Sequence, residues 1–161
     1  ITFKNKRIYK GETTADIFVK SSKILKPINC PSSLNSFAID ELLLIFLVAG
    51  TKTKGISTFK KLGELNKKES PRLNIAIKFL RMIGIKVLRN KDDIKIYGKP
   101  NLDLKRNFHV KNFLKDHRIF MMSCIAALTL GGNWKINDKD SINTSFPKFL
   151  NVLKNLGANI K

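Results

Sequence analysis

Residues able to bind anions and transfer protons are concentrated in the stretch Lys68-Glu69-Ser70-Pro71-Arg72. Serine can cap a helix, and proline suits the first helical position because its missing N–H needs no partner there. The apolar positions that follow predict a helix ending at Gly84. Arg72 would lie in the first turn of this helix, where the helix dipole disfavours a cation unless the arginine and the helix N–H groups share an anion.

The same arrangement recurs at Asp116-His117-Arg118, which precedes the apolar run Ile119–Leu130 and the pair Gly131-Gly132. Asp116 is the expected N-cap of this second helix, and Arg118 again lies in a first turn. Either arginine taken alone is equally well explained as an ordinary surface side chain. The two together, each beside an acid, indicate a site for anionic ligands.

Asp40, with Glu41 beside it, stands at the entrance of the most apolar segment of the chain, Leu42–Ala49. One interpretation is an ordinary N-cap. The other is a partly buried carboxylate suited to proton transfer. The sequence leaves open which interpretation holds and whether Asp40 and Glu69 face the same cleft.

The rest of the pattern predicts a mixed α/β (α+β) domain in which helices, glycines and strands alternate at irregular intervals. The expected elements are a buried helix over 42–49 ended by Gly50, a strand pair or bent strand over 51–59, a hairpin of strands 85–88 and 94–97, one strand within the polar stretch 99–115, a strand over 134–136, and a last helix that opens at 143–147 and reaches Leu156.

Composition limits the classes of function. The chain has 161 residues, 43% of them hydrophobic, and a net charge of +19 from 31 basic and 12 acidic residues. The lysines are spread along every segment, as on a solvated surface, so charge alone does not establish a nucleic-acid partner. No apolar run approaches the roughly 18 residues of a membrane span. The two cysteines and two histidines lack metal-ligand spacing, so no metal site is expected.

Four motifs together resemble the 3-phosphoshikimate 1-carboxyvinyltransferase (EPSP synthase) family. They are Ile39-Asp40-Glu41, Glu64-Leu65 with Lys68-Glu69-Ser70 and Arg72, Asp116-His117-Arg118 and Thr144-Ser145-Phe146-Pro147, and their order and intervals match over most of residues 15–161. The resemblance implies part of an inside-out α/β barrel domain built from βαβαββ repeats, with substrates bound between two such domains. It also implies a transferase that moves the enolpyruvyl group of phosphoenolpyruvate to the 5-hydroxyl of shikimate 3-phosphate, with no metal and no organic cofactor.

The resemblance also implies roles for individual residues. Asp40 would act as the base toward the 5-hydroxyl, and Lys68 would contact shikimate 3-phosphate. Glu69 would handle the proton at the methylene carbon of phosphoenolpyruvate. Arg72 and Arg118 would bind phosphoenolpyruvate, since a guanidinium fits a planar carboxylate.

His117 and Thr144 are further candidates for the site. Pro71 departs from the family, which usually has aspartate there, so we expect the helix start to survive without one interaction that the aspartate would support. Because the chain begins at Ile1 without an initiator methionine and matches the last third of the family, residues 1–161 are expected to form one partial domain of a cytoplasmic enzyme that is monomeric when complete. Such a fragment, lacking the N-terminal domain, is expected to be inactive alone.

Two other interpretations compete with the enzyme. A basic nucleic-acid-binding module would explain the charge of +19, although the interleaved acids Asp40, Glu69 and Asp116 argue against it. A non-catalytic remnant of the enolpyruvyl transferase fold would be expected to have lost its motif acids, and these are present.

Overall fold

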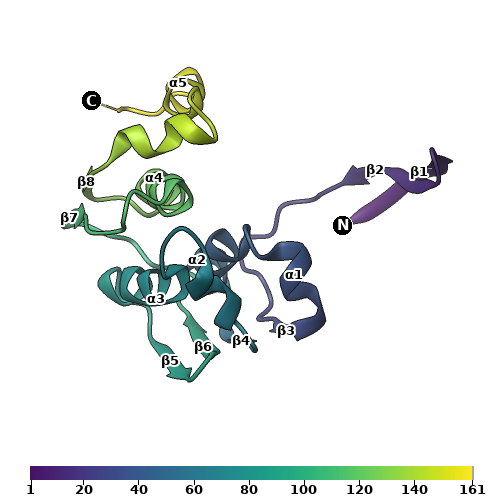
Figure 1. The fold of residues 1–161 in the computed structure, drawn as a ribbon, viewed down its shortest axis with the longest axis horizontal. Helices are drawn as coiled ribbons and strands as arrows, with labels where there is room; N and C mark the ends of the chain where they lie inside the picture. The colour runs from purple at the N-terminus through teal and green to yellow at the C-terminus, as the bar shows by residue number, and fades with distance from the viewer. Residues whose placement is uncertain (161) are drawn as a thin grey trace.

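Helices occupy the centre of the computed structural model, which describes residues 1–160, and short β-sheets flank them (Figure 1). The three helices α2 (Leu42–Thr51), α3 (Arg72–Met82) and α4 (His117–Leu130) pack against one another. This packing joins segments that lie far apart in sequence. It also brings the N-terminal ends of the helices together, which matters for the site described below.

The main sheet has four strands in the order β3-β4-β6-β5, namely β3 (Asn29–Cys30), β4 (Gly55–Phe59), β6 (Asp93–Gly98) and β5 (Val87–Asn90). β3 runs parallel to β4, while β6 is antiparallel to both β4 and β5. In chain order these strands and the helices between them read β3-α2-β4-α3-β5-β6. The predicted βαβαββ unit is therefore present in full.

The chain then begins the same order again. β7 (Asn107–Val110) precedes α4 in the chain, and β8 (Asn133–Ile136) follows it. The two strands pair with each other in parallel, and α5 (Phe149–Asn155) comes after them. Short helical segments link the main elements: η1 (Ser32–Leu34), α1 (Asn35–Ala38), η2 (Gly63–Lys67) and η3 (Lys139–Thr144). Built from repeated units with helices inside and strands outside, this mixed α/β arrangement is the predicted one.

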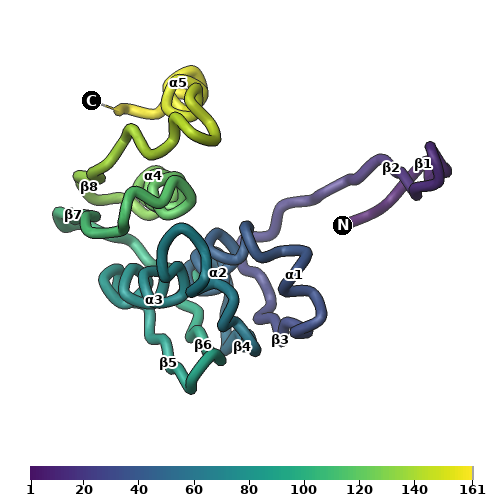
Figure 2. The backbone as a smooth tube through the Cα atoms, in the orientation of Figure 1, coloured from purple at the N-terminus to yellow at the C-terminus, as the bar shows by residue number. Residues whose placement is uncertain are grey.

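A two-stranded hairpin stands apart from this body. β1 (Thr2–Tyr9) and β2 (Glu12–Phe18) pair in antiparallel fashion, and an extended segment connects them to the rest of the chain (Figure 2). The side chains of β1 are exposed along its whole length, and those of β2 nearly so. The hairpin thus contributes nothing to the helical core.

The prediction that the apolar segment 42–49 is a buried helix is confirmed, but its predicted end is wrong. α2 continues to Thr51, so the strand expected from residue 51 begins only at Gly55. Gly50 lies inside the helix, where a Cβ atom would come 3.1 Å from the side chain of Ile85. A glycine at this position serves close packing of α2 rather than helix termination.

The last helix also begins later than predicted. Asn143 and Thr144 belong to η3, and α5 starts only at Phe149. By contrast, the predicted ends of α3 and α4 are confirmed, because Gly84 (φ 88°) and Gly131 (φ 75°) follow them in the left-handed region that glycine tolerates. Short sequence signals, such as these glycines, therefore predicted most helix ends correctly.

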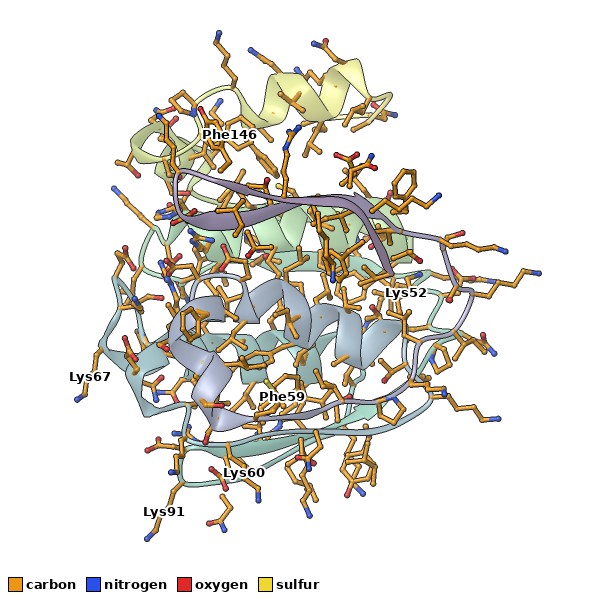
Figure 3. All side chains as sticks on the ribbon, turned by 90° about the vertical axis from the view of Figure 1, so that its right-hand side faces the viewer. Lys52, Phe59, Lys60, Lys67, Lys91 and Phe146 are labelled. Carbon is orange, nitrogen blue, oxygen red and sulfur yellow. The ribbon has the colours of Figure 1, made fainter. Side chains whose placement is uncertain are left out.

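The lysine side chains are distributed around the outside of the body. Figure 3 shows Lys67 and Lys91 pointing outward, while Phe59, which is fully buried, lies inside. Within residues 1–160, no single helix is long and apolar enough to cross a membrane; the pair Ser32–Ala38 and Leu42–Thr51 passes that test only when combined, and it is bent by 117°.

Candidate active site

The predicted site residues lie at the starts of the three central helices. Asp40 precedes α2, Lys68 and Glu69 precede α3, and Arg118 is in the first turn of α4. Side-chain contacts connect all three starts, although Asp40 and Arg118 are 78 positions apart in the chain. The fold therefore assembles one cluster from three sequence motifs.

Arg72 is the centre of this cluster, and its side chain is only 1% exposed. Its Nε donates to Asp116 Oδ2 at 2.8 Å, its Nη1 to Asp40 Oδ1 at 2.8 Å, and its Nη2 to Glu69 Oε2 at 2.5 Å. The anion expected beside this arginine is thus supplied by three carboxylates of the chain itself. Asp40 and Glu69 contact the same guanidinium group, at two of its three nitrogens.

Asp40 also lies close to the other two cations of the cluster, Arg118 and Lys68. Arg118 Nη2 lies 3.7 Å from Asp40 Oδ2, and Lys68 Nζ lies 3.9 Å from Asp40 Oδ1. Arg118 Nη1 donates to the backbone carbonyl of Asp40 at 3.0 Å and to Glu41 Oε1 at 3.3 Å. The interpretation of Asp40 as an ordinary N-cap is wrong: Glu41 occupies the cap position of α2 without a side-chain bond, and the Asp40 carboxylate turns to the arginines.

Asp116 is the N-cap of α4, as predicted. Its Oδ1 accepts from the backbone N–H groups of Arg118 at 2.9 Å and Ile119 at 3.4 Å. The predicted cap of α3 is wrong, because the Ser70 hydroxyl donates to Asp116 Oδ2 at 2.8 Å and Pro71 holds the cap position without a side-chain bond. The Ser70 side chain is oriented toward the buried Asp116 carboxylate and makes no capping bond to the amides at the start of α3.

Burial and charge oppose each other at the central ion pair. Burial alone would lower the pKa of Arg72, but hydrogen bonding to Asp116 and the charges of Asp116 and Glu69 raise it overall. Burial alone would raise the pKa of Asp116, but hydrogen bonds from Arg72 and Ser70, with the charge of Arg72, lower it overall. Both groups are therefore held in their charged forms.

Two of the predicted candidates lie outside this network. His117 is the first residue of α4 and is half-buried, and within residues 1–160 its side chain has no hydrogen bond or ion pair. The Thr144 hydroxyl donates to the Ser141 carbonyl inside η3. In the same range, no three or more His, Cys, Asp or Glu side chains are grouped so as to hold a metal ion.

The partnership between Arg72 and Asp116 was not predicted from sequence, nor was the contact between Arg118 and Glu41. The available signal was the unfavourable position of each arginine at a helix start, which indicated that an anion must compensate it. The sequence could not show that the compensating acid of Arg72 comes from the next helix, 44 positions away.

Comparison with known proteins identifies the family. The family model described as EPSP synthase (3-phosphoshikimate 1-carboxyvinyltransferase) matches residues 10–153. The chain belongs to the EPSP synthase family. The central cluster of two arginines and their acids lies within the matched residues.

Individual relatives agree with this assignment. The 3-phosphoshikimate 1-carboxyvinyltransferase of Ruthia magnifica subsp. Calyptogena magnifica is 37% identical over 164 residues, covering 99% of this chain and 36% of that protein. The protein of the same name from Staphylococcus aureus (strain COL) is 37% identical over 144 residues, covering 89% and 32%. The solved EPSP synthase from Acinetobacter baumannii superposes with a TM-score of 0.82 at 32% identity, covering 99% of this chain and 36% of that one.

The extent of the match is as informative as its strength. The chain spans about a third of the length of these EPSP synthases, and nearly all of it is matched. The structural match confirms the enolpyruvyl transferase fold for this third.

Proposed function

We propose that this chain supplies one wall of the active site of a 3-phosphoshikimate 1-carboxyvinyltransferase. The enzyme would transfer the enolpyruvyl group of phosphoenolpyruvate to the 5-hydroxyl of shikimate 3-phosphate and release phosphate. The observation that carries the proposal is the convergence of Asp40 and Glu69 on Arg72, with Arg118 and Lys68 beside them. Addition followed by elimination needs both a proton donor and a proton acceptor near the reacting carbons, and this cluster holds both kinds of group beside anion-binding cations.

The proton transfers can be assigned to the two outer carboxylates. Glu69, once displaced from Arg72, takes up a proton from solvent. In the addition step, Asp40 takes the proton of the 5-hydroxyl as the hydroxyl oxygen attacks the central carbon of phosphoenolpyruvate, and Glu69 gives its proton to the methylene carbon. In the elimination step, Glu69 takes a proton back from that carbon as the bond to phosphate breaks and the double bond forms again, and Asp40 passes its proton to the departing phosphate. Their side chains are 40% and 59% exposed, so both can reach a bound substrate.

The arginines would bind the substrate carboxylate. Asp40 and Glu69 bond to Nη1 and Nη2 of Arg72, and the Arg72 side chain is only 1% exposed, so a substrate carboxylate would have to displace at least one of these acids to reach the guanidinium group. Displacement releases the acid from its ion pair at the moment when phosphoenolpyruvate arrives. Substrate binding and the freeing of a proton-transfer group are thereby linked.

The rest of the enzyme belongs to the proposal too. Residues 1–161 form a partial domain, and the substrates would lie between it and the N-terminal domain that the relatives possess. Lys68, whose side chain is 27% exposed, would contact shikimate 3-phosphate from this side. The complete enzyme would be a cytoplasmic monomer.

The test is phosphate release from phosphoenolpyruvate, with and without shikimate 3-phosphate, by a hybrid enzyme. The hybrid joins this chain to the part of the Ruthia magnifica relative that the chain does not span. We expect release only when both substrates are present. Glu69→Gln should lower the turnover rate by about 10²- to 10⁴-fold, the usual contribution of a general acid–base group.

The matched control is Glu12→Gln, the same chemical change at an exposed glutamate in β2. It should leave turnover near that of the unaltered hybrid. A folded hybrid that releases no phosphate would overturn the proposal and favour a non-catalytic remnant of the fold. Equal rates in the two variants would remove Glu69 from the mechanism.

A further inference from the structure

Asp116 is the one acid of the cluster that does not face outward. Its side chain is fully buried, whereas those of Asp40 and Glu69 are 40% and 59% exposed. It contacts Nε of Arg72, at the base of the guanidinium group, while the two outer nitrogens turn to the exposed acids. Asp116 therefore lies behind the arginine and does not meet a substrate.

Each oxygen of Asp116 serves a different helix. Oδ2 accepts from Ser70 Oγ and Arg72 Nε at the start of α3, both at 2.8 Å. Oδ1 accepts from the backbone N–H groups of Arg118 and Ile119 at the start of α4. A single carboxylate thus fixes the orientation of the Arg72 guanidinium group and the position of the backbone that carries Arg118.

The backbone before Asp116 is held in an unusual conformation. Asn112, Leu114 and Lys115 all have positive φ, from 55° to 60°. The Asp116 N–H donates to the Phe113 carbonyl at 3.1 Å, and the Phe113 side chain is 1% exposed. Such conformations cost free energy in residues with side chains and persist where the surroundings over-determine them. The loop that leads into Asp116 is therefore held in place by the buried Phe113 side chain and by the Asp116 carboxylate.

We propose that Asp116 is a positioning residue. It fixes the orientations of Arg72 and Arg118 relative to each other, so that both can bind one substrate carboxylate. The inference rests on the proposed function, because it assigns the two arginines to phosphoenolpyruvate. An amide cannot replace the carboxylate: asparagine has one acceptor oxygen and one donor nitrogen, so it can cap α4 but would turn an N–H₂ group toward the Nε–H of Arg72. Asparagine caps helices as well as aspartate does, so Asp116→Asn separates the two tasks.

The first measurement is made on this chain by NMR of the arginine Nε–H groups and the backbone amides. In Asp116→Asn we expect exchange of the Arg72 Nε–H with solvent to become at least about 10-fold faster, because its charged acceptor is removed. Protection of the Ile119 amide should persist, because the cap remains. The matched control, Asp103→Asn, makes the same change at an exposed aspartate paired only with Lys105, and it should alter neither signal.

The second measurement is made on the hybrid enzyme. Asp116→Asn should raise KM for phosphoenolpyruvate by about 10-fold or more, since small misplacement of binding groups is costly. KM for shikimate 3-phosphate should stay within about twofold, because Asp40 and Lys68 are not held by Asp116. A residue with a merely structural role would alter both constants together.

The outcomes are separable. Unaltered Arg72 exchange in Asp116→Asn, or altered exchange with unaltered KM for phosphoenolpyruvate, would overturn the inference. An inactive parent hybrid would count against the proposed function, and the arginine signals would then decide the positioning role alone. If Asp116→Asn does not fold, Ser70→Ala takes its place; it removes one bond to Oδ2 without a change of charge, and unaltered Arg72 exchange in that variant would be the refuting result.

Discussion

Arg72 combines nearly complete burial with full positive charge, and the structure compensates it on three sides. Removing a charge from water costs several kcal/mol, so a buried arginine is stable only where acceptors replace its hydration. Asp116, Asp40 and Glu69 provide one acceptor for each of its three nitrogens. The acids differ in exposure: Asp116 is fully buried behind the arginine, whereas the side chains of Asp40 and Glu69 are open to solvent.

The lowered pKa of Asp116 makes the stability of the chain depend on pH in a defined direction. A carboxyl whose folded-state pKa lies below its ordinary value of 3.8 stabilises the fold above that value, and the contribution is lost as pH falls through the lower, folded-state pKa. Each pKa unit corresponds to about 1.4 kcal/mol. The free energy of unfolding should therefore fall more steeply below about pH 4 in the unaltered chain than in Asp116→Asn.

Urea unfolding of both proteins between about pH 2 and about pH 7, a range that spans the ordinary aspartate pKa of about 3.9, would measure this difference. At neutral pH, Asp116→Asn should be less stable by about 3 kcal/mol, because it leaves a buried guanidinium nitrogen without its charged acceptor. Parallel pH curves would show that Asp116 is not held in its charged form by the fold.

At the scale of elements, charged side chains gather at the helix starts, and glycines follow the ends of α3 and α4. α2, α3 and α4 bring their positive ends together, and four carboxylates gather there with three cations (Asp40, Glu41, Glu69 and Asp116 with Lys68, Arg72 and Arg118). The negative charges offset both the helix dipoles and the basic side chains. The site is therefore a property of helix packing rather than of any one helix.

The two glycines that end α3 and α4 should differ in their tolerance of alanine. At Gly84 (φ 88°) a Cβ atom would meet nothing within 4 Å, so Gly84→Ala should cost only the backbone strain of about 1–2 kcal/mol. At Gly131 (φ 75°) a Cβ atom would also come 3.0 Å from the Leu104 carbonyl oxygen. Gly131→Ala should therefore destabilise the chain more, by about 2–3 kcal/mol.

Urea unfolding midpoints of the two alanine variants would rank them. A smaller loss of stability at Gly131 than at Gly84 would show that the contact with the Leu104 carbonyl relaxes at little cost.

At the scale of the whole molecule, two acids of the cluster are partly exposed on the surface, with side chains 40% and 59% exposed. The acids that face outward, Asp40 and Glu69, belong to a chain that spans 36% of the length of the Ruthia magnifica relative. The charge of +19 is distributed over the body instead of being gathered on this cluster. The net charge therefore attracts anions to the whole body rather than to this cluster in particular.

Residues 1–161 alone should not turn over phosphoenolpyruvate, even with shikimate 3-phosphate present. The reason is that one wall supplies the arginines and proton-transfer groups but leaves the substrates without the second wall that would fix them and exclude water. Phosphate release should appear only when the remaining two thirds of an EPSP synthase is joined to the chain. Measurable release by residues 1–161 alone would contradict this expectation.

The sequence by itself determined the helices, most of their ends, the hairpin of β5 and β6, and the family. These features depend on short-range properties: apolar periodicity, the cap at Asp116, the glycines at 84 and 131, and motifs of three to five residues. The sequence also singled out Asp40, Glu69, Arg72 and Arg118 as the residues able to do the chemistry.

Only the tertiary structure decided how those residues are connected. It turned the Ser70 hydroxyl from its own helix to Asp116, 46 positions away, and it turned Asp40 from a cap into an acceptor for Arg72. It also kept Gly50 inside α2 for packing against Ile85. Such choices depend on burial, since a desolvated charge takes the strongest acceptors that the packed helices bring within reach, wherever these lie in the chain.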